Sequence, residues 1–452
     1  MKKLAVIIVA ALTLIPFAAS AQYQTNDAPE TAPVTITLEE ALQIALSENV
    51  SVKVADMEIE RTGYAKKGSY ASLFPQIDLT GSYQRTIKKQ AMFMSMGEGQ
   101  EPMKIEVGMY NTITTSASVA MPLVNVQLWE SLKVSAMDVE LAVEKARGSR
   151  LETVTQVKNA YYAILFAKEA FNVYKEVYEN AVKNYDETKR KFDAEKVSEM
   201  ELLRSKTTVA NAIPNVYNAE NSVILALWQL KAVLGVDLDL NLDIAGKLDD
   251  YAQKMFYDIH KNDDVSLDSN STMKQLAIQA EMLAENIKLQ KYANIPSLSL
   301  AFNFNMNAMT NDFNFSEYRW TPYSVVGLSL NVPIFAGGKR YQQIRQAKNQ
   351  YQQVQLQTVD AERQLKIAIR QFLTTMETNM KSYYAAQDAV AAAQKGYDIV
   401  EKSYQVGRST LIELNDAQLG LTQAQLAQSQ AIYNFVTAKA QLEQTLGQDF
   451  IE

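Results

Sequence analysis

The chain contains one pattern twice, and the second copy follows the first at an offset of 212 residues, the distance between Leu234-Gly235 and Leu446-Gly447. The segment Tyr404-Gln-Val-Gly-Arg-Ser-Thr-Leu-Ile-Glu-Leu-Asn-Asp-Ala-Gln418 lies between two long helical patterns, and Gly407 is its only breaker. Residues 192–206 occupy the matching place in the first copy. Any fold for this chain must therefore repeat one unit, and we expect helical hairpin tips at about 192–198 and 404–410.

Each copy also contains two segments with the period of a strand. They are expected at about 76–87 and 111–121, and again at about 297–307 and 324–332. Each is about ten residues long, which is enough for a tilted strand to cross a bilayer. One face is apolar and the other is small and polar, which favours a membrane barrel with water inside over a soluble, half-buried sheet. Pro122 and Pro333 are expected to close the strands.

Long amphipathic helices account for most of the remaining chain. The first is predicted to open at Thr37 with a capping box to Glu40 and to run to about Leu73. A run of roughly seventy residues, 123–192, would form a helix roughly 105 Å long. Within it, large residues recur every seven positions, as in a coiled coil: Val157, Ile164, Phe171, Tyr178, Tyr185 and Phe192. Pro214 is expected to kink the first descending helix.

The N-terminus is typical of a secretory signal peptide at residues 1–21, with Met1-Lys-Lys, an apolar run and Ala19-Ser-Ala21 before a cut at Gln22. The first copy is then expected at 22–235 and the second at 271–447, with a linker at 236–270 and a tail at 448–452. After residue 21 there is no apolar run long enough for a membrane-spanning helix. His260 is interpreted as an ordinary surface residue.

Several classes of function are disfavoured by composition. The chain has no cysteine, which excludes a disulfide framework, thiolate chemistry and a lipid anchor at the cut. Its formal net charge of −7, with both signs interspersed, gives no clustered basic surface of the kind that binds nucleic acid. No nucleophile elbow, metalloprotease motif or phosphate loop is present, so we predict neither an enzyme nor a cofactor.

Four strands cannot close a membrane barrel, because about eight is the practical minimum and open edges are not tolerated in lipid. The strands must therefore be completed by other copies, giving eight strands from a dimer or twelve from a trimer. The long helices would extend the barrel as a tube.

These features together resemble the TolC-type outer-membrane efflux family. The resemblance rests on the duplicated helix–strand–strand–helix–helix order, the 404–418 tip, the opening helix Leu38-Glu-Glu-Ala-Leu-Gln-Ile-Ala-Leu46 and the strand entry Leu73-Phe-Pro-Gln-Ile77, and it covers essentially the whole mature chain. It implies a mainly α fold with a membrane part: a homotrimer whose twelve-stranded barrel in the outer membrane continues into a periplasmic α-helical coiled-coil barrel. It also implies two partners, a periplasmic adaptor (membrane fusion protein) and an inner-membrane RND or ABC-type pump.

The resemblance further implies an adaptor-docking surface at the hairpin tips. The family's Val-Gly turn corresponds here to Val406 and Gly407, followed by Arg408 and Ser409. The first copy has Ala194 and Glu195 in place of Val-Gly, so we expect the two tips to contact an adaptor unequally.

The family's periplasmic aperture lies just beyond the turn. Glu413 and Asp416 match its acidic positions, and three copies would place six carboxylates around one opening, which attracts cations. Tyr404 and Glu201 match positions that link neighbouring helices. The first copy has Arg204 where the second has Asp416.

The sequence leaves two alternatives open. The methionine-rich segment with Met92, Met94, Met96, Met103 and Met109 is typical of a flexible apolar extracellular loop, and ligation of a soft metal such as Cu(I) is its alternative interpretation. For the chain as a whole, the leading hypothesis is a passive export duct. The alternative is a structural or adaptor-like periplasmic coiled-coil protein of the envelope.

Overall fold

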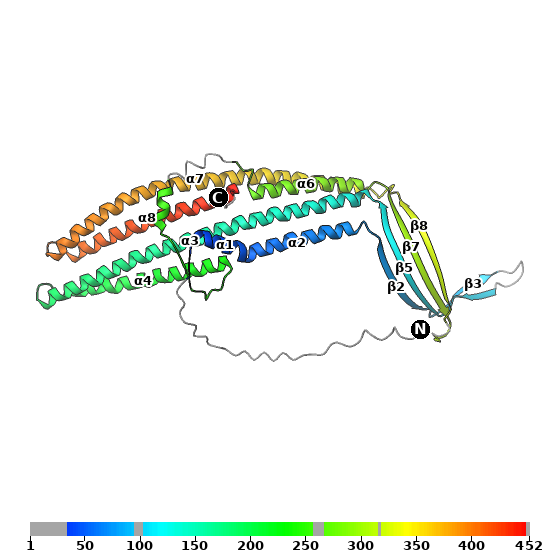
Figure 1. Cartoon of the computed structure of the whole chain (residues 1–452), viewed down its shortest axis with the longest axis horizontal. Coiled ribbons are helices and arrows are strands. Elements are labelled where there is room, and N and C mark those ends of the chain that lie inside the picture. The colour runs from blue at the N-terminus through cyan, green and yellow to red at the C-terminus, as the bar shows by residue number, and fades with distance from the viewer. Residues whose placement is uncertain (1–33, 95–102, 256–265, 315–317, 449–452) are drawn as a thin grey trace.

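The computed structural model describes residues 34–94, 103–255, 266–314 and 318–448. The predicted signal peptide, His260, Met96 and most of the predicted tail lie outside these residues. The molecule is elongated: helices lie along its length, a β-sheet forms one end, and two hairpin turns form the other (Figure 1).

Two helical hairpins of nearly equal dimensions turn at the end of the molecule away from the sheet (Figure 1). In the first, α3 (Val126–Asp193) has 68 residues and α4 (Glu199–Leu234) has 36. In the second, α7 (Lys339–Gln405) has 67 residues and α8 (Leu411–Leu446) has 36. The expected helical hairpin tips are therefore present in both copies. Within the described residues, no helix combines the length and the hydropathy needed to cross a membrane.

The sheet contains one pair of strands from each copy. Its order is β2-β5-β7-β8, and each neighbouring pair is antiparallel. The four strands are β2 (Gln76–Arg85), β5 (Asn111–Val124), β7 (Ser297–Thr310) and β8 (Trp320–Asn331). The two copies meet at the centre of the sheet, where β5 pairs with β7.

The register gives this sheet one apolar and one polar face. Ile77, Val119, Phe302 and Val326 are successive cross-strand partners, and so they form one apolar row across all four strands. One residue further along, partners on the other face are Asp78, Ser118, Asn303 and Val325. The next row on that face includes Ser116, whose hydroxyl donates to Asn305 Oδ1 at 2.6 Å. The alternation seen in the sequence is thus continuous from strand to strand.

Pro122 does not end its strand where the sequence suggested, whereas β8 ends at Asn331, just before Pro333 as expected. β5 continues through Pro122 to Val124, with a register irregularity between these two residues. Pairing of β2 with β5 ends at Ala120, so the missing N–H of Pro122 faces no partner on that side. Similarly, β8 contains Pro322, which is tolerated because β8 is an edge strand within the described chain.

The connection between β2 and β5 forms a second, smaller hairpin that was not predicted. β3 (Gln90–Met94) and β4 (Met103–Val107) pair antiparallel with each other and with no other strand of the described residues. The hairpin projects from the end of the sheet opposite the helices (Figure 1).

The first helix predicted from Thr37 to about Leu73 is in fact two helices. Its capping box between Thr37 and Glu40 is present, but α1 (Leu38–Glu48) ends before Asn49 and α2 (Val50–Ala71) begins after it. The Asn49 side chain accepts from the N–H of Ser51 at 2.8 Å and donates Nδ2–H to the Val233 carbonyl near the end of α4 at 2.6 Å. This long-range contact, which local sequence does not encode, fixes the break.

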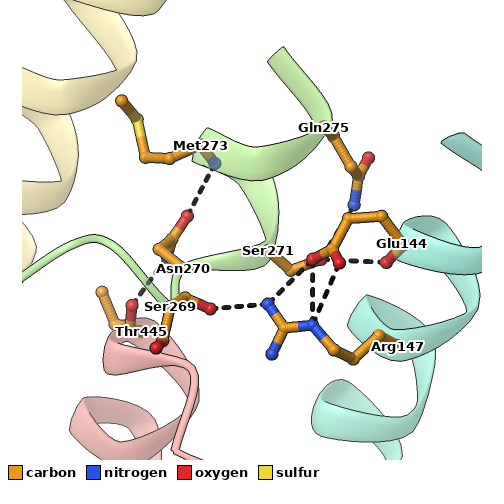
Figure 2. Close-up of polar contacts among 8 residues, drawn as sticks. All are labelled: Glu144, Arg147, Ser269, Asn270, Ser271, Met273, Gln275 and Thr445. Atoms are coloured by element: carbon orange, nitrogen blue, oxygen red, sulfur yellow. Dashed lines mark hydrogen bonds and ion pairs between the residues drawn. The ribbon is translucent and has the colours of Figure 1, made fainter. Parts of the chain in front are cut away.

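The second copy contains the same joint between α8 and α6 (Ser271–Tyr292). Asn270 accepts from the N–H of Met273 at 2.9 Å and donates to the Thr445 carbonyl at 2.6 Å (Figure 2). Arg147 of α3 pairs with Glu144 at 2.8 Å and donates to the Ser269 carbonyl, which ties the same joint to the first copy.

A left-handed glycine completes each joint, and neither site has space for a Cβ atom. Gly235 has φ +76°, and a Cβ there would lie 2.7 Å from the Glu48 carbonyl oxygen. Gly447 has φ +68°, and its Cβ would lie 2.1 Å from the Ser269 carbonyl oxygen. Each descending helix is therefore joined end to end with a short helix of the same copy by an asparagine amide and a close backbone contact.

The main core lies beside these joints, around the middle of α3. Val157, Ile164 and Phe435 are fully buried there. The predicted linker supplies β6 (Leu242–Ile244), which pairs in parallel with β1 (Val34–Ile36), and the short helix η1 (Leu248–Lys254). α4 continues through Pro214, where the sequence suggested a kink.

A buried carboxyl pair lies between α3 and α6 near the sheet. Glu130 is 5% exposed and lies beside the half-buried Glu285, which pairs with Lys288 at 2.8 Å. Lys133 lies 3.6 Å from the Glu130 carboxyl. Burial and the neighbouring Glu285 raise the pKa of Glu130.

Candidate functional site

The two hairpin tips have the same backbone geometry. At the first, the N–H of Lys196 donates to the Lys191 carbonyl and that of Glu195 to the Phe192 carbonyl, both at 2.8 Å. These two bonds define a Schellman motif, in which the residue after the helix adopts a left-handed conformation. Glu195 takes that conformation with φ 58°, which a residue with a Cβ adopts only at a cost.

At the second tip, Arg408 donates to the Ser403 carbonyl at 2.8 Å and Gly407 to the Tyr404 carbonyl at 3.0 Å. Gly407 occupies the left-handed position with φ +74°. Copy one therefore forms the same turn as copy two although it has Ala194 and Glu195 where copy two has Val406 and Gly407.

The tip residues that the resemblance assigned to docking are exposed, except for Ser409, which is half-buried. Val406 is 69% exposed, and Gly407, Arg408, Ala194 and Glu195 also lie on the surface. A Cβ added at Gly407 would meet no atom within 4 Å. The second turn is therefore open to a partner.

The helices that leave the tips begin with side-chain caps. Ser198 accepts from the N–H of Glu201 at 3.3 Å, and Thr410 accepts from that of Glu413 at 3.3 Å. Glu413 in turn accepts from the N–H of Thr410 at 2.7 Å. This capping box holds the Glu413 carboxylate against the first turn of α8, in an exposed position. Asp416 lies one turn further along α8 and is also exposed.

Tyr404 is the buried centre of the contact between the two hairpins. Its hydroxyl forms a 2.8 Å hydrogen bond with Thr188 Oγ1 of α3, and both side chains are buried. Burial raises the pKa of Tyr404, and the nearby Glu201 carboxylate, its expected partner, adds to this effect. The sequence did not identify Thr188 as a partner of Tyr404.

Lys191 is a second residue that the sequence reasoning missed. Its Nζ donates to the carbonyls of Tyr404 at 3.3 Å and Gln405 at 3.4 Å, which are in the last turn of α7. It also lies 4.8 Å from the centroid of the Tyr404 ring and 3.1 Å from the Glu187 carboxylate. A cation at a helix C-terminus is favoured by the helix dipole. Lys191 therefore links the end of α7 to α3.

Further polar contacts join the two hairpins along their length. Lys183 of α3 pairs with Glu401 of α7 at 2.9 Å, and Asn415 of α8 donates to Thr208 of α4 at 3.2 Å. By contrast, among the described residues no ion pair joins Arg204 to Asp416.

A cleft of about 630 Å³ lies between the two tips. The sequence-predicted residues that line it are Glu201, Arg204, Tyr404, Val406, Gly407 and Ser409. Those outside its lining are Ala194, Glu195, Arg408, Glu413 and Asp416. An adjoining cleft of about 610 Å³ is lined by Met200, Leu203 and Ile412, which are exposed apolar residues.

Comparison with known proteins shows which family shares this architecture. The outer membrane efflux protein family matches residues 41–236 and again residues 264–448. The outer membrane protein TolC of Vibrio cholerae is 20% identical over 391 residues, which cover 85% of this chain and 84% of that protein. The probable efflux pump outer membrane protein TtgC of Pseudomonas putida is 24% identical over 433 residues, covering 92% and 84%.

Solved structures have the same fold. The CmeC outer membrane channel of Campylobacter jejuni superposes with a TM-score of 0.71 at 18% identity, covering 91% of this chain and 85% of that chain. The family match falls once on each half of the chain, as the duplication requires, and together the two matches cover most of it. The chain therefore belongs to the TolC-type outer membrane efflux protein family.

Proposed function

We propose that three copies of this chain form an exit duct across the outer membrane, which passively conducts substrates from a pump in the inner membrane. The sheet is the observation that supports this proposal most directly. Its edge strands β2 and β8 have no outer partner in the described chain, and one face is apolar while the other is polar. Three such sheets make twelve strands, which is enough to close a barrel with lipid outside and a polar lumen inside.

The helices would continue this barrel as a periplasmic tube, with the tips at its far end. The duct supplies no energy, so it needs an energised inner-membrane pump of the RND or ABC type and a periplasmic adaptor that bridges the gap. TtgC, which is named as a probable efflux pump outer membrane protein, supports the same arrangement for this chain. We propose that a cleavable signal peptide at residues 1–21 directs this chain out of the cytoplasm.

The tips would dock the adaptor. The exposed turn at Val406, Gly407 and Arg408, with Ser409 beside it, forms one docking surface, and the turn at Ala194 and Glu195 forms another with the same backbone geometry. Each trimer would offer three surfaces of each kind.

The aperture would be controlled just behind the tips. Glu413 and Asp416, from three chains, would form a ring of six carboxylates that favours cations. The contacts of Tyr404 with Thr188 and Lys191 would hold the second hairpin against the first, with Glu201 and Arg204 in the same cleft. Opening then requires these contacts to break when an adaptor docks.

Disulfide cross-linking tests the assembly. Because the chain has no native cysteine, only the introduced cysteines can form disulfides. Thr80→Cys in β2 is combined in turn with cysteine at positions on the same face of β8, namely Thr321, Tyr323, Val325, Gly327 and Ser329. We expect one or two neighbouring combinations to give disulfide-linked trimers. Val326→Cys, on the opposite face, is the matched control and should not cross-link. Saturation at two linked chains, or no cross-link at any position, would contradict the trimer.

Docking is tested by Gly407→Trp, which we expect to abolish export while trimers persist. Gly337→Trp is the control, because Gly337 also has a left-handed φ of +59° and open space around its Cβ but lies near the sheet. Equal export in both variants would refute the docking role.

For the aperture, Glu413→Gln/Asp416→Asn should reduce cation preference in planar-bilayer conductance, and unchanged selectivity would refute the carboxylate ring.

A further inference from the structure

The small hairpin of β3 and β4 carries methionines on one face. Its register places Met94 directly opposite Met103 and Met92 opposite Ile105. Side chains alternate between the two faces of a strand, so Met92 and Met94 point to the same side, and Met103, as the direct partner of Met94, shares that side. Three thioether side chains therefore lie together on one surface of the hairpin.

The distances implied by this register allow the three sulfurs to meet. Direct cross-strand partners have Cβ atoms roughly 4.5–5.5 Å apart, and residues two apart along a strand are separated by roughly 6.6 Å. Methionine has three rotatable bonds and adapts its shape readily. Met92 and Met94 are each 55% exposed and Met103 is 48% exposed, so a dissolved ion can reach them without any rearrangement of the hairpin.

The opposite face of the hairpin has different chemistry. It carries Phe93 together with Lys104 and Glu106, which pair at 3.4 Å. The methionine face continues instead into Ile105 and Val107. The charges that would attract a hard, hydrated cation are thus on the far side, and the sulfurs have apolar neighbours.

Methionine is also concentrated in this hairpin. Three of the ten residues in its two five-residue strands are methionine, whereas the whole chain has 17 in 452 residues. The chain has no cysteine and one histidine, so thioethers are its only sulfur ligands. Elsewhere, the described residues contain no group of three histidine, cysteine, aspartate or glutamate side chains that could hold a metal ion.

We propose that Met92, Met94 and Met103 bind one soft monovalent cation, Cu(I) or Ag(I), through their three sulfur atoms. Soft thioether ligands select such ions over Mg²⁺, Ca²⁺ or Zn²⁺. A thioether has no proton to release, so binding at this site does not depend on pH in the way that binding by cysteine, histidine or carboxylate does. This site is independent of the duct proposed above, because it needs only the hairpin.

Calorimetric titration of the purified full-length protein with Ag(I), in chloride-free buffer, tests the proposal without redox chemistry. We expect one high-affinity Ag(I) per chain. Met94→Leu/Met103→Leu, which keeps side-chain volume nearly constant, should weaken binding at least tenfold, and Met92→Leu alone should weaken it less. Met57→Leu/Met200→Leu removes two exposed methionines from helices and should bind as the wild type does.

Two further measurements identify the ligands. X-ray absorption of the silver-loaded protein should show a shell of sulfur atoms, and the affinity should stay constant between about pH 5 and pH 8. The proposal is overturned if no stoichiometric binding occurs, if Met94→Leu/Met103→Leu binds normally, or if affinity falls with acidification as carboxylate ligands would require.

Discussion

The glycine of the second joint gives the sharpest test of how the helices are held together. Three glycines have nearly the same left-handed φ but different surroundings: a Cβ at Gly407 meets nothing within 4 Å, one at Gly235 lies 2.7 Å from a carbonyl oxygen, and one at Gly447 lies 2.1 Å from a carbonyl oxygen. Substitution by alanine at Gly407 therefore measures the backbone cost alone, and the other two add a steric overlap.

The expected losses of unfolding free energy follow from these surroundings. Gly407→Ala should cost about 1–2 kcal/mol, the usual price of a left-handed residue with a Cβ. Gly447→Ala should cost about 3–6 kcal/mol, because it adds about 1–3 kcal/mol of overpacking and about 1 kcal/mol for the disturbed hydrogen bond from Asn270 to Thr445. Gly235→Ala, with the milder overlap, should fall between them.

Denaturant unfolding followed by far-UV circular dichroism, on purified protein in detergent, measures these differences. Substitution by asparagine separates the backbone cost from the steric overlap, because asparagine adopts the left-handed conformation more readily than alanine but still carries a Cβ atom. Gly407→Asn should approach wild-type stability, whereas Gly447→Asn should remain strongly destabilised. Equal losses at the two positions would refute the argument that the joint depends on close backbone contact.

Three further predictions concern single side chains. Glu195→Gly should stabilise the fold by about 0.5–1 kcal/mol, because glycine relieves the strain of the left-handed conformation and the added freedom of the unfolded chain offsets only part of that gain. The control Ala194→Gly, at a residue outside that conformation, should destabilise the fold. The reverse order of stabilities in denaturant unfolding would contradict this reasoning. Glu130 binds its proton more tightly in the folded chain, so its contribution to stability is present at acidic pH and is lost as the pH rises through its raised pKa. Glu130→Gln keeps a donor for Glu285 and should therefore be more stable than the wild type at about pH 8 but not at about pH 4. A pH series of unfolding midpoints would disprove this if the difference between variant and wild type did not change with pH. Tyr404→Phe removes the buried hydroxyl contact between the hairpins, which is worth about 1 kcal/mol. It should therefore accelerate limited proteolysis at the tips about fivefold. An unchanged cleavage rate would show that the Tyr404 hydroxyl does not hold the tips together.

The repeated architecture could be predicted because its signals are local. Strand alternation, heptad spacing and the Thr37 capping box each depend on residues within a few positions of one another. The duplication then allowed the cleaner second copy to support the interpretation of the first.

The features that the sequence did not predict depend on distant partners. Asn49 breaks the first helix because it donates to a carbonyl 184 residues away, and Tyr404 meets Thr188 across 216 residues. Glu195 offered no turn signal, since the left-handed position it occupies is one that glycine usually marks. The hairpin of β3 and β4 was interpreted as a loop because it lies in a stretch rich in methionine and glycine.

In each helix joint, the asparagine and the glycine come from the same copy. Asn49 and Gly235 lie within the first family match, 41–236, and Asn270 and Gly447 lie within the second, 264–448. Each copy therefore carries its own asparagine–glycine pair, so a gene encoding one repeat would already have specified this contact. In evolutionary terms, a half-length ancestor with this pair could have preceded the full-length chain without any change to the pair. Fusion then let the two copies diverge where they are exposed, as the pair of Glu195 and Gly407 records.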